Sequence, residues 1–229
     1  MPKSHRIHNM TCALMAASGN RTYKPMTLEE AINKYPSGYR RPHPLIEAAR
    51  KNDKEAMTVL LKEFRTGYDI NKPCPDFYFT AFHRAVEHED NVILKMLLEN
   101  KQLDPWARTL PPDGHYTPFL WAIAKGNAEA VKLILEHKFK KKLKPQLHKK
   151  IGKMNALHIA CDHSCGTWTN QDHKMLELLL PYTKTCINKR DKEGQTPLDY
   201  ILVAKGWSDD GAGYDKAKEL LEKHGAKCT

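Results

Sequence analysis

The sequence lacks the features of a membrane protein or of a secreted disulfide scaffold. No apolar run approaches the length of about 18 residues that a membrane-spanning helix needs. Six cysteines are scattered along 229 residues, which favours reduced thiols over a disulfide framework. Aromatic residues make up only 8% of the chain and charged residues 28%, as in a soluble helical protein. We therefore expect a cytoplasmic protein that has no contact with a membrane.

Positive charge is concentrated in one segment. The formal net charge is +10, but residues 138–153 contain eight lysines and no acidic residue, so the remainder is close to neutral. We expect this basic arm, with Lys140, Lys141 and Lys142 at its centre, to bind an acidic patch of a partner. Two alternatives stay open: a solvated helix end, and an adaptor that the arm directs to the nucleus. Nucleic acid is not expected as a partner, because only Phe139 lies nearby as a stacking surface.

A six-residue motif recurs five times and indicates how the chain is organised. Its clearest copy is Thr117-Pro-Phe-Leu-Trp-Ala122, and the five copies begin at residues 43, 80, 117, 155 and 196. A second segment follows each copy and ends in an apolar pair such as Leu97-Leu98. A recurring period of about 20 to 50 residues predicts a stack of supersecondary units rather than one closed core.

The motif has the properties of a helix start. Thr117 supplies an oxygen that accepts from the first free backbone N–H groups, and Pro118 fits the next position because it has no N–H to lose. Phe119 and Ala122, three positions apart, share one helix face. Apolar residues at helical spacing in the segment 129–136 predict a second helix. Neither helix buries its apolar face alone, so the pairs are expected to stack into an all-α solenoid.

The motif resembles the helix start Thr-Pro-Leu-His-x-Ala of the ankyrin repeat, whose unit has about 33 residues. The resemblance covers residues 40–228, although the histidine occurs only at His83 and His158 and the unit is longer than the family norm. It implies an ankyrin-repeat solenoid with long finger loops. Such a solenoid is a scaffold that binds another protein, so we expect no enzymatic activity and no cofactor.

The resemblance also suggests a domain organisation and a biological setting. Residues 1–40 are interpreted as an N-terminal cap or degenerate repeat, in which Thr27 and Glu30 form a capping box that opens a helix over 28–35. Residues 41–229 are interpreted as the repeat domain. Long loops and irregular repeats resemble the ankyrin proteins that intracellular bacteria inject into host cells, which would make the chain a virulence effector in the host cytoplasm. A eukaryotic adaptor fits the same features, and in either case we expect a monomer.

The binding surface is implied to lie on the concave face, at the ends of the first helices, and on the finger loops. In the first three repeats these helix ends carry Arg50, Lys51, Glu87, His88, Ala124 and Lys125. The loops before the second and third motif copies carry Phe77, Tyr78, Phe79, Trp106, His115 and Tyr116. Exposed aromatic side chains anchor protein interfaces, because they bury a large area at low entropy cost. The alternative is that Phe77 or Phe79 folds back onto the stack.

The last two repeats carry matched insertions. The distance from the helix start to the apolar pair is 17 residues in the first three copies and 24 in the last two. The inserts contain Trp168 and Trp207, and neighbouring repeats place equivalent turns side by side. The two indoles are predicted to form a second recognition site. The alternative is that each covers the exposed end of a helix pair.

One cluster has the residue types of a chemical site. His158, Cys161, His163 and Cys165 follow one another at short spacing, with His173 further on. Zinc binds cysteine and histidine at such spacings, and a thiolate beside an imidazole acts as a nucleophile. A small Cys/His-dependent enzyme or a metal-binding module is therefore an alternative function. The favoured interpretation is an ordinary helix of the repeat, in which His158 bonds the backbone and Cys161 packs as a small apolar residue.

Overall fold

The computed structural model describes residues 25–36, 43–63, 69–74, 78–107, 116–137, 154–162, 173–205 and 212–228. Helices account for the regular structure of these ranges, and the all-α fold predicted from the motif is confirmed. Within these ranges helix α2 comes first, and five helix pairs follow it. Their bounds are α2 Leu28–Lys34; α3 Pro44–Arg50 with α4 Lys54–Glu63; α5 Ala81–Ala85 with α6 Val92–Leu98; α7 Pro118–Ala124 with α8 Ala128–Glu136; α10 Ala156–Cys161 with α11 His173–Thr183 and the 3-10 turn Lys184–Cys186; and α12 Pro197–Lys205 with α13 Ala212–Lys223.

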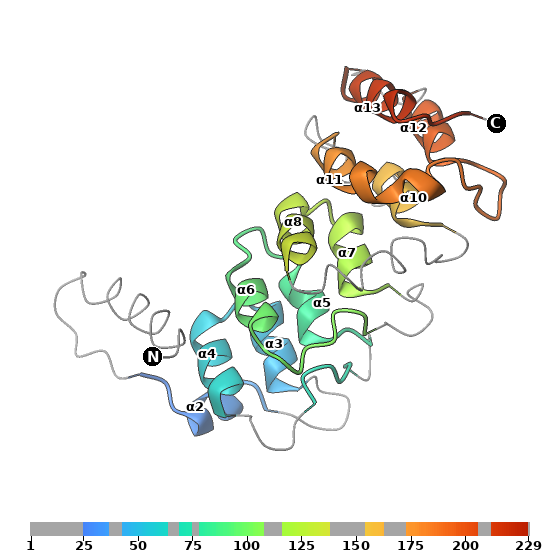
Figure 1. Ribbon diagram of the computed structural model, residues 1–229. Helices are drawn as coiled ribbons and strands as arrows, with labels where there is room; N and C mark the ends of the chain where they lie inside the picture. Colours follow the sequence, from blue (N-terminus) through green and yellow to red (C-terminus); the bar gives the residue numbers. More distant parts are fainter. Residues whose placement is uncertain are drawn as a thin grey trace, which may run out of the picture.

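The helix pairs stack in two parallel rows. The first helices α3, α5, α7, α10 and α12 form one row, and the second helices α4, α6, α8, α11 and α13 form the other (Figure 1). Each pair contacts the pairs before and after it, so the structure extends by addition rather than by closure. Helix α2 packs mainly on α4 and continues the second row at its N-terminal end.

Side-chain caps begin the helices where the motif predicts them. The Thr117 hydroxyl oxygen accepts from the Leu120 backbone N–H at 3.2 Å, and Asn155 performs the same role for α10. The predicted capping box of α2 is confirmed: Thr27 Oγ1 accepts from the Glu30 N–H at 3.2 Å, and a Glu30 carboxylate oxygen accepts from the Thr27 N–H at 2.7 Å. Because each cap needs only neighbouring residues, these helix starts are readable from the sequence alone.

One continuous apolar core runs through the stack. Its largest fully buried side chains come from both rows, and the small alanine of the motif lets neighbouring helices approach closely. They are Phe82, Phe119, Leu45, Met57, Leu60, Ile93, Leu94, Leu97, Leu120 and Ile134. Among the described residues, no helix is both long and apolar enough to cross a membrane.

The motif histidine ties one repeat to the next. Nδ1 of His83 accepts from the Thr80 N–H at 3.2 Å, so its Nε2 carries the proton and donates to the Tyr116 carbonyl at 3.0 Å. His158 repeats this arrangement, with Gln195 O as its acceptor at 3.1 Å. In the last repeat Asp199 stands at this position and accepts from the N–H and hydroxyl of Thr196 at 2.7 and 2.8 Å. The bonds of this aspartate therefore stay within its own repeat, whereas His83 and His158 also bond the following repeat.

Asn127 joins the third repeat to the second. Its Nδ2 donates to Val86 O at 2.9 Å and His88 O at 3.1 Å, while its Oδ1 accepts from the Ala130 N–H at 2.9 Å and caps α8. We expect Asn127→Ala to lower the free energy of unfolding by about 2 kcal/mol, because the cap and two inter-repeat bonds are lost together. Urea denaturation followed by circular dichroism measures this change.

Asn127→Asp is the matched control, because a carboxylate keeps the cap but cannot donate to the two carbonyls. If the inter-repeat bonds matter, this variant is also destabilised. A wild-type midpoint for Asn127→Asp would show that capping alone accounts for the role of Asn127.

Stability is expected to fall in mild acid. Burial lowers the pKa of His83 to about 4, against an ordinary value of about 6.5. Burial and the charge of Lys72 lower the pKa of His43 to about 4 as well. Between these values the unfolded chain binds protons that the folded chain does not, so stability is lost as the pH falls from about 6.5 to 4. Denaturation midpoints should decline as the pH is lowered from 7.5 to 4.5. Above pH 7 these two histidines are neutral in both the folded and the unfolded chain, so they should cause no change in the midpoint.

The variant His43→Asn tests this prediction, because asparagine caps a helix well and does not titrate. We expect it to take up about one proton fewer on unfolding near pH 5, seen as a shallower dependence of stability on pH. Equal stability of the wild type at pH 7.5 and pH 5 would contradict the assignment of neutral histidines at positions 43 and 83.

Candidate functional site: the first-helix face

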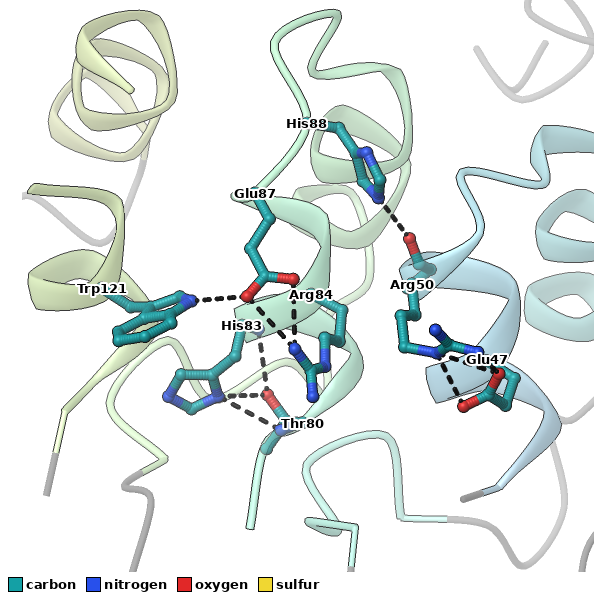
Figure 2. Close-up of polar contacts among 9 residues, drawn as sticks. Glu47, Arg50, Thr80, His83, Arg84, Glu87, His88 and Trp121 are labelled. Carbon is teal, nitrogen blue, oxygen red and sulfur yellow. Dashed lines mark hydrogen bonds and ion pairs between the residues drawn. The ribbon is translucent and has the colours of Figure 1, made fainter. Parts of the chain in front are cut away.

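The outer side of the first helices carries a row of polar and aromatic side chains. Counting from the first motif residue, the fifth and eighth positions lie one helical turn apart, on the side of the first helices that faces away from the second row. In the first three repeats, these positions and the ninth carry the side chains that we call the first-helix face. It consists of Glu47, Arg50 and Lys51 at α3, Arg84 and Glu87 at α5, and Trp121 and Lys125 at α7 (Figure 2 shows all but Lys51 and Lys125).

Each of the first two repeats holds an ion pair one turn apart, but in opposite orders. On α3 the guanidinium of Arg50 donates to the Glu47 carboxylate through Nε at 3.0 Å and Nη2 at 2.7 Å. These bonds raise the pKa of Arg50, so this side chain stays charged. On α5 the order is reversed, and Arg84 Nη1 lies 3.2 Å from both carboxylate oxygens of Glu87. The two carboxylates are thus satisfied within their own repeats.

Glu87 also connects the second repeat with the third. Its Oε1 accepts from the indole Nε1 of Trp121 at 3.0 Å, a bond that Figure 2 shows crossing between α5 and α7. The indole is fixed further by two rings, because the Phe79 centroid lies 5.0 Å away and the Tyr116 ring meets it edge-on at 5.4 Å. The ammonium of Lys125 lies 4.6 Å from the indole centroid. Trp121 is therefore a half-buried, preorganised side chain in the middle of the face.

The charge that the first-helix face offers to a partner is positive. The Glu47 and Glu87 side chains are only 17% and 22% exposed, and both accept from neighbouring cations or the indole. The Arg50 side chain is 42% exposed, and Lys51 and Lys125 are exposed as well. Because the carboxylates are already hydrogen-bonded, the accessible cations beside them attract anionic groups of a partner and increase the rate of association.

The predicted residues at the helix ends have different surroundings. Arg50, Lys51 and Lys125 lie at the surface, as expected of contact residues. His88 is half-buried and its Nε2 bonds the Ala49 carbonyl at 2.8 Å, so it links two repeats (Figure 2). Ala124 is only 4% exposed, so the expectation that it contributes to the concave surface is wrong. Its side chain belongs to the apolar core.

The prediction that Phe79 is an exposed anchor is wrong, and the alternative that it folds back is confirmed. Phe79 is 6% exposed. Its ring lies between the Arg84 guanidinium, 4.4 Å from the ring centroid, and the indole of Trp121. Burying this ring supports the first-helix face from below, because it positions both side chains that cover it.

The other described finger aromatics are half-buried rather than fully exposed. Tyr78 adopts a left-handed backbone conformation with φ of 52°, and Trp106 meets the Phe119 ring edge-on at a centroid distance of 6.5 Å. Tyr116 packs against Trp121. Seven further candidates lie outside the described residues, and their roles stay predictions: Phe77, His115, Lys140, Lys141, Lys142, Trp168 and Trp207.

The described part of the cysteine and histidine cluster has a structural role. Cys161 is fully buried, and burial raises the pKa of its thiol well above the ordinary range, so a thiolate is disfavoured. Both ring nitrogens of His158 are occupied by the Asn155 N–H and the Gln195 carbonyl. His163 and Cys165 lie outside the described residues. In the ranges that the structure describes, no group of three or more His, Cys, Asp or Glu residues is placed to hold a metal ion.

Sequence reasoning missed three residues of the first-helix face. Glu47, Arg84 and Trp121 occupy the fifth motif position, the variable x of Thr-Pro-Leu-His-x-Ala, and none was singled out. The signal was present, because a variable position one turn before an exposed helix end lies on the same face as that end. The bond between Glu87 and Trp121 was not readable, since these residues are 34 positions apart.

Comparison with known proteins identifies the class. A family model described as "Ankyrin repeats (3 copies)" matches residues 45–145 and 82–167, which together span more than half of the chain. The chain therefore belongs to the ankyrin repeat family. It is 29% identical over 170 residues to the Saccharomyces cerevisiae protein named "Probable 26S proteasome regulatory subunit p28", covering 61% of this chain and 67% of that protein.

A solved structure agrees with the fold. The crystal structure of an ankyrin repeat domain from Acinetobacter baumannii AYE superposes with a TM-score of 0.63 at 20% sequence identity. The match covers 98% of this chain and 95% of that domain. At this identity the similarity shows the shared architecture alone.

Proposed function

We propose that this chain is a non-catalytic scaffold that binds a protein partner through its first-helix face. The observation that carries the proposal is the preorganised cluster at the centre of that face, where Trp121 is held by Glu87 and flanked by Lys125. A side chain that is already ordered loses little conformational entropy when it enters an interface, and tryptophan is enriched among residues that dominate binding energy. Ankyrin repeats in general serve protein recognition, which is consistent with this role.

The partner is proposed to present acidic groups. Arg50, Lys51 and Lys125 are exposed, whereas the two carboxylates of the face are satisfied internally. The basic arm, residues 138–153, follows α8 in the sequence and adds eight lysines. Binding driven by such charges weakens as the salt concentration rises.

The name of the yeast relative supports a role within a protein assembly. That protein is named as a probable regulatory subunit of the 26S proteasome, so it is described as part of a multi-protein assembly. By analogy, the present chain is proposed to act as an adaptor within a protein complex, as a monomer in the cytoplasm or the nucleus. Action as a bacterial effector on a host protein stays a prediction from the long loops and irregular repeats.

Site-specific photo-crosslinking tests the proposal. A photoreactive amino acid at Lys51 or Lys125 is expected to form an adduct with one and the same protein, whereas the same group at Lys95, exposed on α6 of the second row, is expected to form none. The double variant Lys51→Glu/Lys125→Glu should bind that protein at least about tenfold more weakly at low salt, and less so at high salt. Equal crosslinking from both rows, or no effect of charge reversal, would contradict binding through the first-helix face.

A further inference from the structure

The outward positions of the first helices change chemistry along the stack. In the first three repeats the fifth and eighth motif positions carry two ion pairs, Trp121 and a buried alanine. In the last two repeats the same positions carry Ile159, Asp162, Tyr200 and Val203. Ile159 is 5% exposed and Tyr200 is half-buried, and its hydroxyl donates to Asp191 at 2.7 Å. Asp162 is the one charged residue among these four.

Val203 is the most exposed large apolar side chain of the described residues, at 51%. It stands seven residues after the motif start Thr196, as Arg50 follows His43 and Glu87 follows Thr80. Since α12 begins with proline at the same motif position as α3, Val203 occupies the register of these two contact residues. Leu202 beside it is 37% exposed, although its counterparts Ala49, Val86, Ile123 and Cys161 are buried at 3% or less. An apolar patch thus lies on α12, the last described helix of the first row, whereas the exposed cations lie at α3 and α7.

We infer that the partner of the first-helix face is a chain segment with two parts: acidic residues that contact the end with Arg50, Lys51 and Lys125, and an apolar residue that contacts Val203 and Leu202. This inference rests on the proposed function and adds the composition and the orientation of the bound segment. Charge complementarity decides the orientation, because the exposed cations lie on α3 and α7 and the exposed apolar side chains lie on α12.

The spacing of the two parts follows from helix packing. Neighbouring helices pack about 8 to 10 Å apart, so two steps from α7 to α12 cover about 16 to 20 Å. An extended chain advances about 3.3 Å per residue, so an acidic residue near Lys125 and the apolar residue at Val203 are separated by about five or six residues. A partner segment that also reaches Lys51, at the end of α3, spans four such steps and needs about ten to twelve residues.

Selection of displayed random 16-residue peptides on the full chain tests the inference. Enriched peptides are expected to hold Asp or Glu in one half and Leu, Ile or Phe in the other, at the spacing given above. Val203→Asp should weaken their binding at least tenfold, and selection on this variant should keep the acidic residues and lose the apolar ones. Val92→Asp is the matched control, because Val92 is 37% exposed on the second row and should leave binding unchanged.

The outcomes separate this inference from the proposed function. If the enriched peptides are acidic without an apolar part, or if Val203→Asp binds them as the wild type does, the two-part segment is wrong while recognition of acidic proteins stands. If Lys51→Glu/Lys125→Glu has no effect on the selected peptides, the first-helix face is not the binding site, and both proposals fail. Both proposals are also contradicted if selection on the wild-type chain enriches no peptide more than selection on the Lys51→Glu/Lys125→Glu variant does.

Discussion

Replacing Phe119 by alanine is expected to lower the free energy of unfolding by about 4 kcal/mol. Phe119 lies in α7 of the middle repeat and has no exposed surface. Removing its ring deletes a large buried apolar area and leaves a cavity between repeats that rigid neighbouring helices fill only in part. Urea denaturation monitored by circular dichroism at 222 nm measures the loss.

The position of Phe119 predicts a second effect on cooperativity. In a stack each repeat is stabilised by its nearest neighbours, so weakening the middle repeat uncouples the two ends. The unfolding transition of Phe119→Ala should therefore broaden and its denaturant dependence should decrease. Phe119→Leu, which retains most of the apolar volume, should cost about 1 to 1.5 kcal/mol and keep one sharp transition. A loss below about 2 kcal/mol in Phe119→Ala would contradict the packing described for α7.

The variant His83→Ala is expected to lose about 3 kcal/mol, an unusually large effect for a polar side chain. His83 is completely buried, and its two ring nitrogens serve the Thr80 cap and the Tyr116 carbonyl. Alanine leaves both groups without their partner and opens a cavity between the second and third repeats. His224→Ala, which changes an exposed histidine in the last repeat, should stay within about 0.5 kcal/mol of the wild type.

The pH dependence of His83→Ala shows whether the variant loses a neutral, hydrogen-bonded imidazole or only packing. Because the pKa of His83 is lowered to about 4, the wild type loses stability as the pH falls below about 6.5. A chain without His83 should take up about one proton fewer on unfolding near pH 5, so that its stability depends less steeply on pH. Stability curves of the two proteins that stay parallel from pH 7.5 to 4.5 would show that His83 is not held neutral in the folded chain.

The repeat architecture could be predicted because its signals are local. The caps at Thr27, Thr117 and Asn155 satisfy backbone groups within three residues, and the apolar spacing within each helix sets its buried side. The structural interpretation of Cys161 and His158 followed from the same helix pattern. These inferences did not depend on contacts between side chains of different repeats.

The composition of the candidate site could be predicted only in part. Arg50, Lys51 and Lys125 were recognised because a helix end of fixed register exposes them. Phe79 was assigned to the surface because a loop residue carries no periodic signal that would indicate burial. Its ring is buried by the Arg84 side chain of the following helix and by Trp121, which belongs to the next repeat.

The sequence by itself determined the helix starts, the order of the repeats and the excess of positive charge, since each depends on neighbouring residues or on composition. The tertiary structure decided which side chains of adjacent repeats meet. His88 bonds Ala49 across 39 positions and Glu87 bonds Trp121 across 34, and these contacts form only when helices of successive repeats are in register. It also exposed Val203 at the eighth motif position of α12 while burying Ala124 at the same position of α7, because the packing around each repeat decides whether a motif position is buried.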